Sequence, residues 1–252
     1  MNEIATWRDD PDKTYDFLTG FAVGLKLYNT RKSLILAKKL HEGQYRKGGA
    51  PYLVHPLRVC NYLKAFEFED DILLSAALLH DVVEDVESVR NNPQNLVNEY
   101  GISQDVLDVV RKLTKSKEIP IEVYYKGISE DWRALLIKLS DRCNNLSTLD
   151  CFTTEKMKSY IKETVDYVLP LCAYAKLHYP EYGDKITIMK YHITALCSTL
   201  EKLLSLIDKN NLQKTVEGGT ENGWIQWNNS RTFTNAAKSA WCSWTVLWRS
   251  CE

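Results

Sequence analysis

The sequence predicts an all-α protein. Apolar residues recur at intervals of three and four over most of the chain, as at Leu135, Leu139, Cys143 and Leu146, which places them on one face of a helix. No stretch alternates apolar and polar residues for long, so half-buried strands are not expected. The 252 residues are 44% hydrophobic and 26% charged, which suits one large folded domain or a domain with an appendage.

The expected helices follow one another with turn signals between them. The first covers 12–29, and Thr30 is expected to cap the second. A turn is predicted over 48–51, and Pro56 fits the first turn of the third helix, where its missing N–H costs no hydrogen bond. The remaining helices are expected over 70–85, 96–100, 103–113 with Ser103 as cap, 132–146, 154–178 with a bend at Pro170, and 184–208.

Shifts in composition divide the chain into three parts. Residues 1–29 are expected to form a helical extension, 30–208 the main domain, and 209–252 a linker and a tail. The linker is indicated by the Gly-rich run over 217–223, and the tail holds five of the seven tryptophans with little aliphatic support. We expect a loosely docked tail; the alternative is an aromatic patch for self-association or for a membrane surface.

Charge and composition argue against several kinds of partner. The formal net charge of −1 gives no general attraction to nucleic acid or to an anionic membrane. No apolar stretch is long enough to span a bilayer, and the start of the chain is too polar for a secretory signal. The seven cysteines include no CxxC pair, which favours reduced thiols and a cytoplasmic location. The sequence does not indicate an oligomeric state.

One stretch, over 76–85, combines an apolar start with a cluster of ionisable side chains. Within the expected helix His80 and Glu84 are four residues apart, and so are Asp81 and Asp85. Such groups are costly to bury unless something pairs with them, and a divalent metal ion favours neutral imidazole and ionised carboxylate. The alternative is a helix that emerges into solvent with acidic residues at its end.

Two further segments offer ligands of the same kind. His55 lies at the entrance of its helix, and Asp141 shares one helix face with Lys138 and Asn145. With His80 and Asp81 they would form a mixed nitrogen and oxygen site, suited to a first-row divalent ion in a roughly octahedral shell with positions open to water. Such an ion makes its bound water more acidic and neutralises phosphoryl oxygens, and Glu84 and Asp85 lie one turn beyond for acid–base work.

The motifs around these residues occur in a specific order. They are Gly43-Gln44-Tyr45-Arg46-Lys47, Gly49-x-Pro51-Tyr52-x-x-His55-Pro56, Ala76-Ala77-Leu78-Leu79-His80-Asp81-x-Val83-Glu84-Asp85, and Lys138-Leu139-x-Asp141-Arg142-x-x-Asn145-Leu146. In these motifs, over about 30–200, the chain resembles the HD-domain phosphohydrolases, and within them the RelA/SpoT-type alarmone hydrolases of the stringent response. The compact spacing is most similar to that of the stand-alone small alarmone hydrolases, the type of the metazoan SpoT homologue.

The resemblance implies an HD-domain helical bundle that acts as an enzyme. Members of the family remove the 3′-pyrophosphate of ppGpp or pppGpp, usually with Mn²⁺, and yield GDP or GTP and pyrophosphate. The motif match implies His55, His80, Asp81 and Asp141 as metal ligands, with Glu84 and Asp85 positioning or activating water. It implies Arg46 as the guanine-stacking residue, Lys47 as a phosphate ligand, and Asn145, Thr148 and Tyr167 as nucleotide contacts. Lys138 would add a point charge for the anionic substrate.

Two departures from the family pattern leave the substrate open. Ser147 and Asn144 stand where many relatives have arginine and histidine. The missing arginine could shift the preferred base or phosphate, so the adenosine alarmone ppApp, NADPH and nucleoside monophosphates are alternative substrates. A non-catalytic module that binds alarmone or acts as an antitoxin is the other alternative. Tyr52 and His41 are expected to be structural.

Overall fold

The structure is a computed structural model that describes residues 11–217; at residue 150 and over 210–217 it describes the backbone alone. The predicted tryptophan-rich tail therefore lies outside the described residues. Within 11–217 the regular structure is helical, apart from an isolated bridge between Tyr45 and Pro51 that closes the predicted turn over 48–51. The predicted all-α class is confirmed. No helix in this part of the chain combines the length and the apolar character needed to cross a bilayer.

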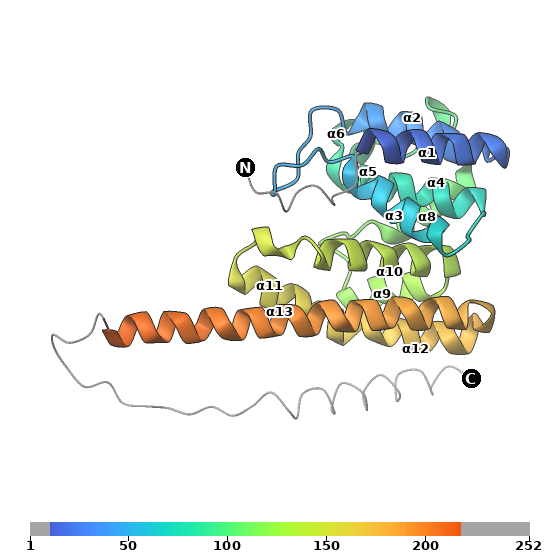
Figure 1. Ribbon diagram of the computed structural model, residues 1–252. Coiled ribbons are helices and arrows are strands. Elements are labelled where there is room, and N and C mark those ends of the chain that lie inside the picture. Colours follow the sequence, from blue (N-terminus) through green and yellow to red (C-terminus); the bar gives the residue numbers. More distant parts are fainter. Residues whose placement is uncertain (1–10, 218–252) are drawn as a thin grey trace.

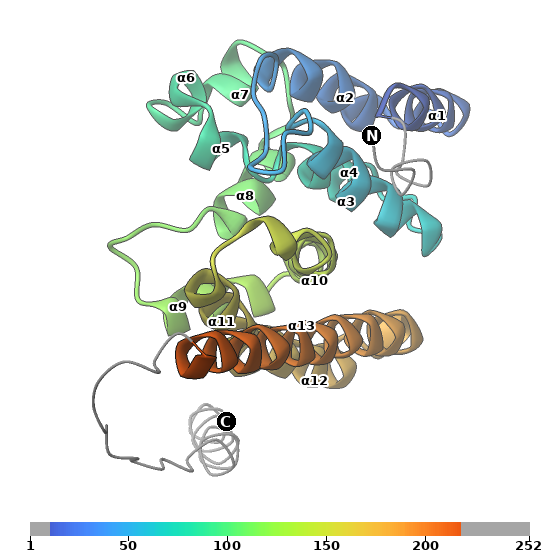
Figure 2. The same cartoon turned by 60° about the vertical axis from the view of Figure 1, so that its left-hand side comes forward.

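The helices form two stacked groups (Figure 1). Figure 2 shows the same division after rotation, with the long helix α13 beneath α10 and α11. The first group contains α1 (Pro11–Gly24), α2 (Tyr28–Leu40), α3 (Val54–Ala65), α4 (Asp71–Leu79), α5 (Val82–Asp85), α6 (Glu87–Arg90), α7 (Asn95–Asn98) and α8 (Gln104–Leu113). The second contains α9 (Ile121–Ser129), α10 (Trp132–Leu146), α11 (Thr154–Glu163), α12 (Leu169–His178) and α13 (Gly183–Glu217).

Helix α4 is the centre of the first group. Every residue from Leu73 to Leu79 is buried, as expected for a helix that is apolar on all sides. It packs against α2, α3, α8 and α10, and the last of these connects it to the second group. Asp70 caps it, because its carboxylate accepts a hydrogen bond from the Leu73 N–H at 2.7 Å. The residues that follow Leu79 are therefore fixed at the end of the most enclosed helix.

The continuous helix expected over 70–85 is interrupted. Helix α4 ends at Leu79 and α5 begins at Val82, so His80 and Asp81 lie in a short turn between them. Both residues keep right-handed helical backbone angles, which explains why the helical spacing in the sequence does not reveal the break. The turn allows the two side chains to leave the helix line and face α3 and α10.

The second helix is capped from another helix and not by Thr30. Helix α2 already begins at Tyr28, and the Asp71 carboxylate accepts from the Asn29 N–H at 2.9 Å and the Thr30 N–H at 2.7 Å. The Thr30 hydroxyl also donates to Asp71 Oδ1 at 2.8 Å. Asp71 thus begins α4 and caps α2, which joins the two helices at their N-terminal ends.

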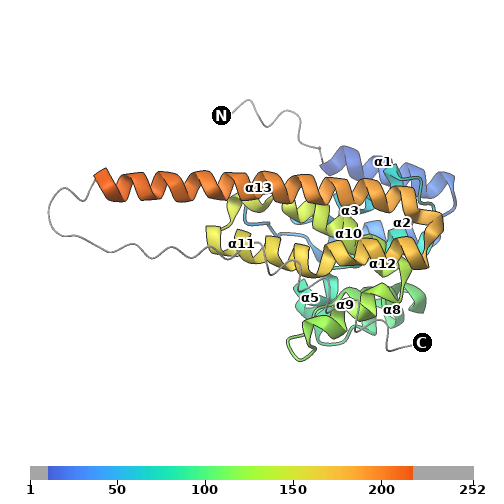
Figure 3. The same ribbon diagram turned by 90° about the horizontal axis from the view of Figure 1, so that it is seen from below.

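Other boundaries also differ from expectation. The helix expected over 154–178 is divided by a π-helical turn, Thr164–Val168, just before Pro170, whose missing N–H breaks the regular ladder. Ser103 precedes α8, but its hydroxyl makes no capping bond. Helix α9 was not expected. Helix α13 continues past residue 208 to Glu217, and its C-terminal end extends beyond the other helices (Figure 3).

Candidate active site

Three of the predicted metal ligands converge from three helices. His55 is the second residue of α3, His80 follows α4, and Asp141 lies in α10; their ligand atoms all lie within 4.8 Å of one another. The two Nε2 atoms are 3.1 Å apart. Asp141 Oδ1 lies 3.3 Å from His55 Nε2 and 3.8 Å from His80 Nε2.

Asp81 adds a second carboxylate to the same point. Its Oδ2 lies 3.3 Å from His55 Nε2 and its Oδ1 lies 3.2 Å from His80 Nε2. The structure therefore brings together all four residues that the motifs indicate as ligands. His55, His80 and Asp141 are buried, so the cluster lies at the floor of the site.

The donor set fits a divalent metal ion. Ligand bonds of about 2.0–2.2 Å imply ligand-to-ligand distances of about 3.0 Å in an octahedron and about 3.4 Å in a tetrahedron, close to those observed. The outer nitrogens are engaged elsewhere: His55 Nδ1 lies 2.7 Å from Asn144 Oδ1, and His80 Nδ1 lies 2.8 Å from the Ala77 carbonyl oxygen. Both partners accept hydrogen bonds, so the ring protons belong on Nδ1 and the Nε2 lone pairs face each other. A cation between them would satisfy all four acceptors.

The electrostatics of the cluster also favour a positive charge at this point. Burial would lower the pKa of His55, but the neighbouring Asp141 and Asp81 carboxylates outweigh burial and raise the pKa to about 9. The same carboxylates that favour a proton on Nε2 would favour a metal ion in its place. Burial would raise the pKa of the Asp141 carboxyl, but Lys138 and the two histidines lower the pKa well below its usual range. The pKa of the Asp81 carboxyl is lowered as well, because His80 and His55 outweigh burial, so both aspartates stay ionised, which is the form that binds a metal ion.

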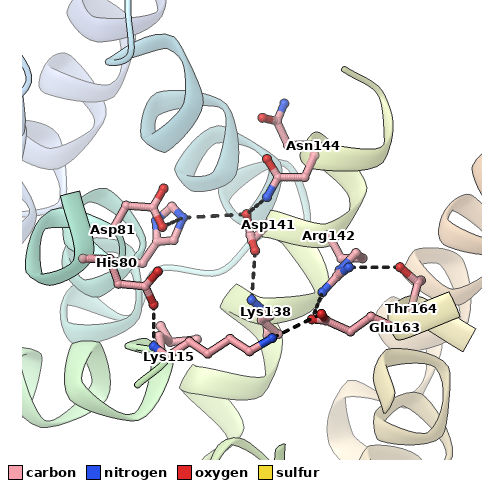
Figure 4. A network of polar contacts seen from close by, with 12 residues as sticks. His80, Asp81, Lys115, Lys138, Asp141, Arg142, Asn144, Glu163 and Thr164 are labelled. Carbon is pink, nitrogen blue, oxygen red and sulfur yellow. Dashed lines mark hydrogen bonds and ion pairs between the residues drawn. The ribbon is translucent and has the colours of Figure 1, made fainter. Parts of the chain in front are cut away.

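Three further side chains orient the two carboxylates. The Lys138 ammonium group donates to Asp141 Oδ2 at 3.2 Å, and the Asn145 amide donates to Asp141 Oδ1. The Tyr52 hydroxyl lies 2.7 Å from Asp81 Oδ2 and also contacts Asp85 Oδ2. Figure 4 shows Asp141 between the His80–Asp81 pair and Lys138. Such partners fix the direction in which a carboxylate presents its free oxygen.

A cavity of about 500 Å³ opens above the cluster. Its lining includes the imidazole and carboxylate side chains of His80, Asp81, Glu84, Asp85, Asp141 and Glu163. It also includes six cationic side chains, those of Arg46, Lys47, Lys115, Lys138, Arg142 and Lys156, of which Lys138 pairs with Asp141 and Lys115 and Arg142 pair with Glu163. The aromatic side chains of Tyr52, Tyr124, Phe152 and Tyr160 also line the cavity. A cavity that combines a cluster of metal-binding side chains with several cationic ones is suited to a small ligand that carries several phosphates.

The predicted substrate residues divide into two groups. Arg46, Lys47, Lys138 and Asn145 line the cavity, and Arg46 donates to Asn145 Oδ1 at 2.6 Å. Thr148 and Tyr167 are not among the lining residues of the cavity. Thr148 follows α10 and its hydroxyl donates to backbone carbonyls at the end of that helix. Tyr167 stacks on Tyr125 at 5.1 Å and donates to Glu122 at 2.9 Å. The structure does not bring these two side chains to the site.

The cavity contains an ionic network that the sequence interpretation missed. The Arg142 guanidinium is buried and donates to Glu163 at 3.0 Å and to the Tyr125 hydroxyl at 3.0 Å. Lys115 donates to the other oxygen of Glu163 at 3.2 Å, and its backbone N–H donates to Glu84 (Figure 4). The network joins Glu84 to α10 and α11. Arg142 stands directly after a predicted ligand, and this was the signal that could have identified it.

Comparisons with known proteins agree with this geometry. A family model described as an HD domain matches residues 33–174, more than half of the chain. The chain therefore belongs to the HD-domain family, which confirms the resemblance seen in its motifs.

Relatives with assigned activities share this part of the chain. A guanosine-3′,5′-bis(diphosphate) 3′-pyrophosphohydrolase of Haemophilus influenzae is 36% identical over 146 residues, 54% of this chain and 21% of the relative. A protein of the same name from Aquifex aeolicus is 37% identical over 143 residues, 54% of this chain and 20% of the relative. The chain thus spans about a fifth of the length of these curated relatives. A solved structure of a metazoan orthologue of SpoT that hydrolyses ppGpp is 28% identical, with a TM-score of 0.46, over 60% of this chain and 96% of that one.

Proposed function

We propose that this protein hydrolyses the 3′-pyrophosphate of guanosine alarmones, and converts ppGpp and pppGpp to GDP and GTP with release of pyrophosphate. The observation that carries the proposal is the convergence of His55, His80, Asp81 and Asp141 at a cavity that is also lined by cationic side chains. The names of the curated relatives support this activity over other reactions of HD-domain proteins. The described cysteines form no disulfide, which supports a reducing compartment such as the cytoplasm.

The metal-binding part of the proposal assigns Mn²⁺ to the four converging side chains. Two imidazole nitrogens and two carboxylates suit a first-row divalent ion. Such an ion, when bound, neutralises phosphoryl oxygens and makes bound water more acidic. His55 and His80 would hold it through their Nε2 atoms, and Asp81 and Asp141 through their carboxylates; Lys138 and Tyr52 contact these carboxylates and would orient them.

Glu84 and Asp85 are the proposed acid–base pair. Both line the cavity, and they follow Asp81 closely in the chain. Burial raises the pKa of the Glu84 carboxyl above its ordinary value, and the nearby Asp81 charge acts in the same direction. The raised pKa makes Glu84 a better proton acceptor from water at neutral pH. Water oxygen forms a bond to phosphorus, the bond from phosphorus to the 3′ oxygen breaks, and the leaving oxygen regains a proton as the 3′ hydroxyl.

The cationic side chains that line the cavity are proposed to bind the nucleotide. The Arg46 guanidinium can stack on a purine ring and still face phosphate oxygens. Its position over the Tyr52 ring, at 5.6 Å, supports a planar stacking role. Lys47 and Lys138 supply point charges for the phosphates. Asn145 lies between Arg46 and Asp141 and is proposed to contact the nucleotide; Thr148 and Tyr167 would need to move to do so.

A substrate panel tests the proposal. Purified protein with Mn²⁺ is incubated with ppGpp, pppGpp, ppApp, NADPH and GMP, and both pyrophosphate and orthophosphate are measured. The proposal expects pyrophosphate from ppGpp and pppGpp at the highest kcat/KM. Faster release of orthophosphate from NADPH or GMP, or a clear preference for ppApp, would contradict the assigned substrate. Binding of ppGpp without turnover would contradict the assigned activity.

A further inference from the structure

We propose that Asn144 is a positioning residue that fixes the tautomer and orientation of His55 and thereby sets the affinity of the site for its metal ion. The inference rests on the metal site of the proposed function and goes beyond it, because neither the motifs nor the metal ligands assign a role to this side chain. Asn144 belongs to α10, three residues after Asp141, and is labelled in Figure 4, whereas His55 belongs to α3.

The contact between the two side chains is well defined. Asn144 Oδ1 lies 2.7 Å from His55 Nδ1; the His55 side chain is only 1% exposed, and Asn144 is half-buried. The opposite ring nitrogen, Nε2, points at His80, Asp81 and Asp141. The imidazole of His55 is thus held between one neutral acceptor on the outside and the ligand cluster on the inside.

The orientation of the amide decides whether His55 can bind a metal ion. With Oδ1 toward the ring, Nδ1 carries the proton and Nε2 presents a lone pair to the cluster. With the amide turned over, its NH₂ group would donate to Nδ1, and the ring proton would occupy Nε2 at the centre of the ligands. A metal ion could not bind there. Asn144 therefore selects the competent tautomer only in the orientation that the structure shows.

The two histidines of the site are fixed by different means. His80 Nδ1 contacts the Ala77 carbonyl oxygen at 2.8 Å, a backbone acceptor that no substitution removes. His55 depends on a side chain, so its orientation can be changed by mutation. A carboxylate in this position makes a histidine a stronger ligand than a neutral amide does, because the negative charge raises the basicity of the ring. Of the two groups that contact an Nδ1 atom, Asn144 is therefore the one that a substitution can change.

A direct contact with substrate does not explain Asn144. Its side chain is not among the lining residues of the cavity, whereas its neighbour Asn145 is. The Asn144 backbone carbonyl accepts from the hydroxyl groups of Ser147 and Thr148, but these bonds do not involve its amide. A positioning role predicts a change in metal affinity, and a substrate contact predicts a change in KM at saturating metal.

The test measures Mn²⁺ binding directly, by calorimetry and by the electron paramagnetic resonance signal of free Mn²⁺. Asn144→Leu removes the acceptor at similar volume, and the dissociation constant for Mn²⁺ should rise about 10- to 100-fold, as is usual for partners of ligating histidines. Asn144→Asp keeps an acceptor and adds charge, so it should bind Mn²⁺ at least as tightly as the wild type. Asn98→Leu, an exposed asparagine on α7, serves as the matched control and should leave binding unchanged.

The binding measurements distinguish a wrong role for Asn144 from a wrong metal site. Equal weakening by the leucine and aspartate variants, or no change in either, would overturn the proposal. A wild-type chain that binds no Mn²⁺ would instead contradict the metal site itself, so the two failures can be told apart. If the leucine variant does not fold, the ring-nitrogen NMR spectrum of the zinc-loaded wild type gives the answer. The proton of His55 should lie on Nδ1, and metal bound at Nδ1 of His55 would overturn the inference.

Discussion

The Tyr52 hydroxyl contacts Asp81 Oδ2 at 2.7 Å and also contacts Asp85 Oδ2. One side chain thus joins a proposed metal ligand to a proposed acid–base residue. The Tyr52 ring stacks on His41 at 4.6 Å, and Arg46 lies over the ring, so the position of the hydroxyl is fixed by its neighbours. The hydroxyl holds the two aspartates in a defined relation to each other.

We expect Tyr52→Phe to retain the fold and lose activity. The substitution keeps the ring contacts and removes only the hydroxyl. A hydrogen bond to a charged group contributes about 1.5–3 kcal/mol, so kcat should fall about 10- to 100-fold. Steady-state kinetics at saturating Mn²⁺ measure the effect, and Tyr191→Phe, an exposed tyrosine on α13, is the control. Unchanged kinetics in the Tyr52 variant would show that the hydroxyl does not matter to the reaction.

Removal of a proposed metal ligand should abolish catalysis and leave the fold intact. Asp81→Ala deletes a carboxylate that lies 3.3 Å from His55 Nε2 and 3.2 Å from His80 Nε2. Turnover should become undetectable, while the helical circular dichroism spectrum stays that of the wild type. Substantial turnover in this variant would remove Asp81 from the ligand set.

Arg46 should act on binding more than on the chemical step. Its guanidinium lines the cavity and donates to Asn145 Oδ1, but it makes no described contact with the acidic cluster. Arg46→Ala should raise KM for ppGpp with little change in kcat, the pattern of a contact made equally in the ground state and the transition state. Kinetics over a range of ppGpp concentrations test this, and the assignment fails if KM is unaltered.

The ion pair of buried Arg142 with half-buried Glu163 should make stability depend on pH. Burial would raise the pKa of the Glu163 carboxyl, but Arg142, Tyr125 and Lys115 outweigh it and lower the pKa to about 2, from an ordinary value of 4.5. A lowered folded-state pKa stabilises the protein fully above about pH 4.5, and this stabilisation is lost as the pH falls toward about 2. Denaturant unfolding of Glu163→Gln should show a shallower loss of free energy below pH 4.5 than the wild type. Identical slopes would contradict the pairing.

Much of the fold follows from local sequence, and the differences have physical causes. The apolar run of α4 and its Asp70 cap are local signals, so the central helix could be predicted. The break at His80–Asp81 could not, because both residues keep helical angles. Helix α9 was missed because a lysine-rich loop and Pro120 precede it. Asp71 replaces Thr30 as the cap of α2 through a contact between residues far apart in the chain.

The residues of the site that belong to short sequence motifs could be predicted. His55, His80, Asp81 and Asp141 belong to short motifs, and the structure brings them together. The roles of Tyr52 and Arg142 depend on contacts across 33 residues, to Asp85, and across 21 residues, to Glu163, which spacing alone does not reveal. Tyr167 belongs to the π-helical turn and stacks on Tyr125, away from the cavity lining. A contact between Tyr167 and the nucleotide therefore stays a prediction.

The central claim is that hydrolysis depends on a metal ion held by these four side chains. The most direct measurement is pyrophosphate release from ppGpp before chelation, after removal of divalent ions, and after Mn²⁺ is restored. Chelation should abolish turnover, and added Mn²⁺ should restore it. Turnover that continues unchanged in metal-free protein would contradict a metal-dependent reaction at this site.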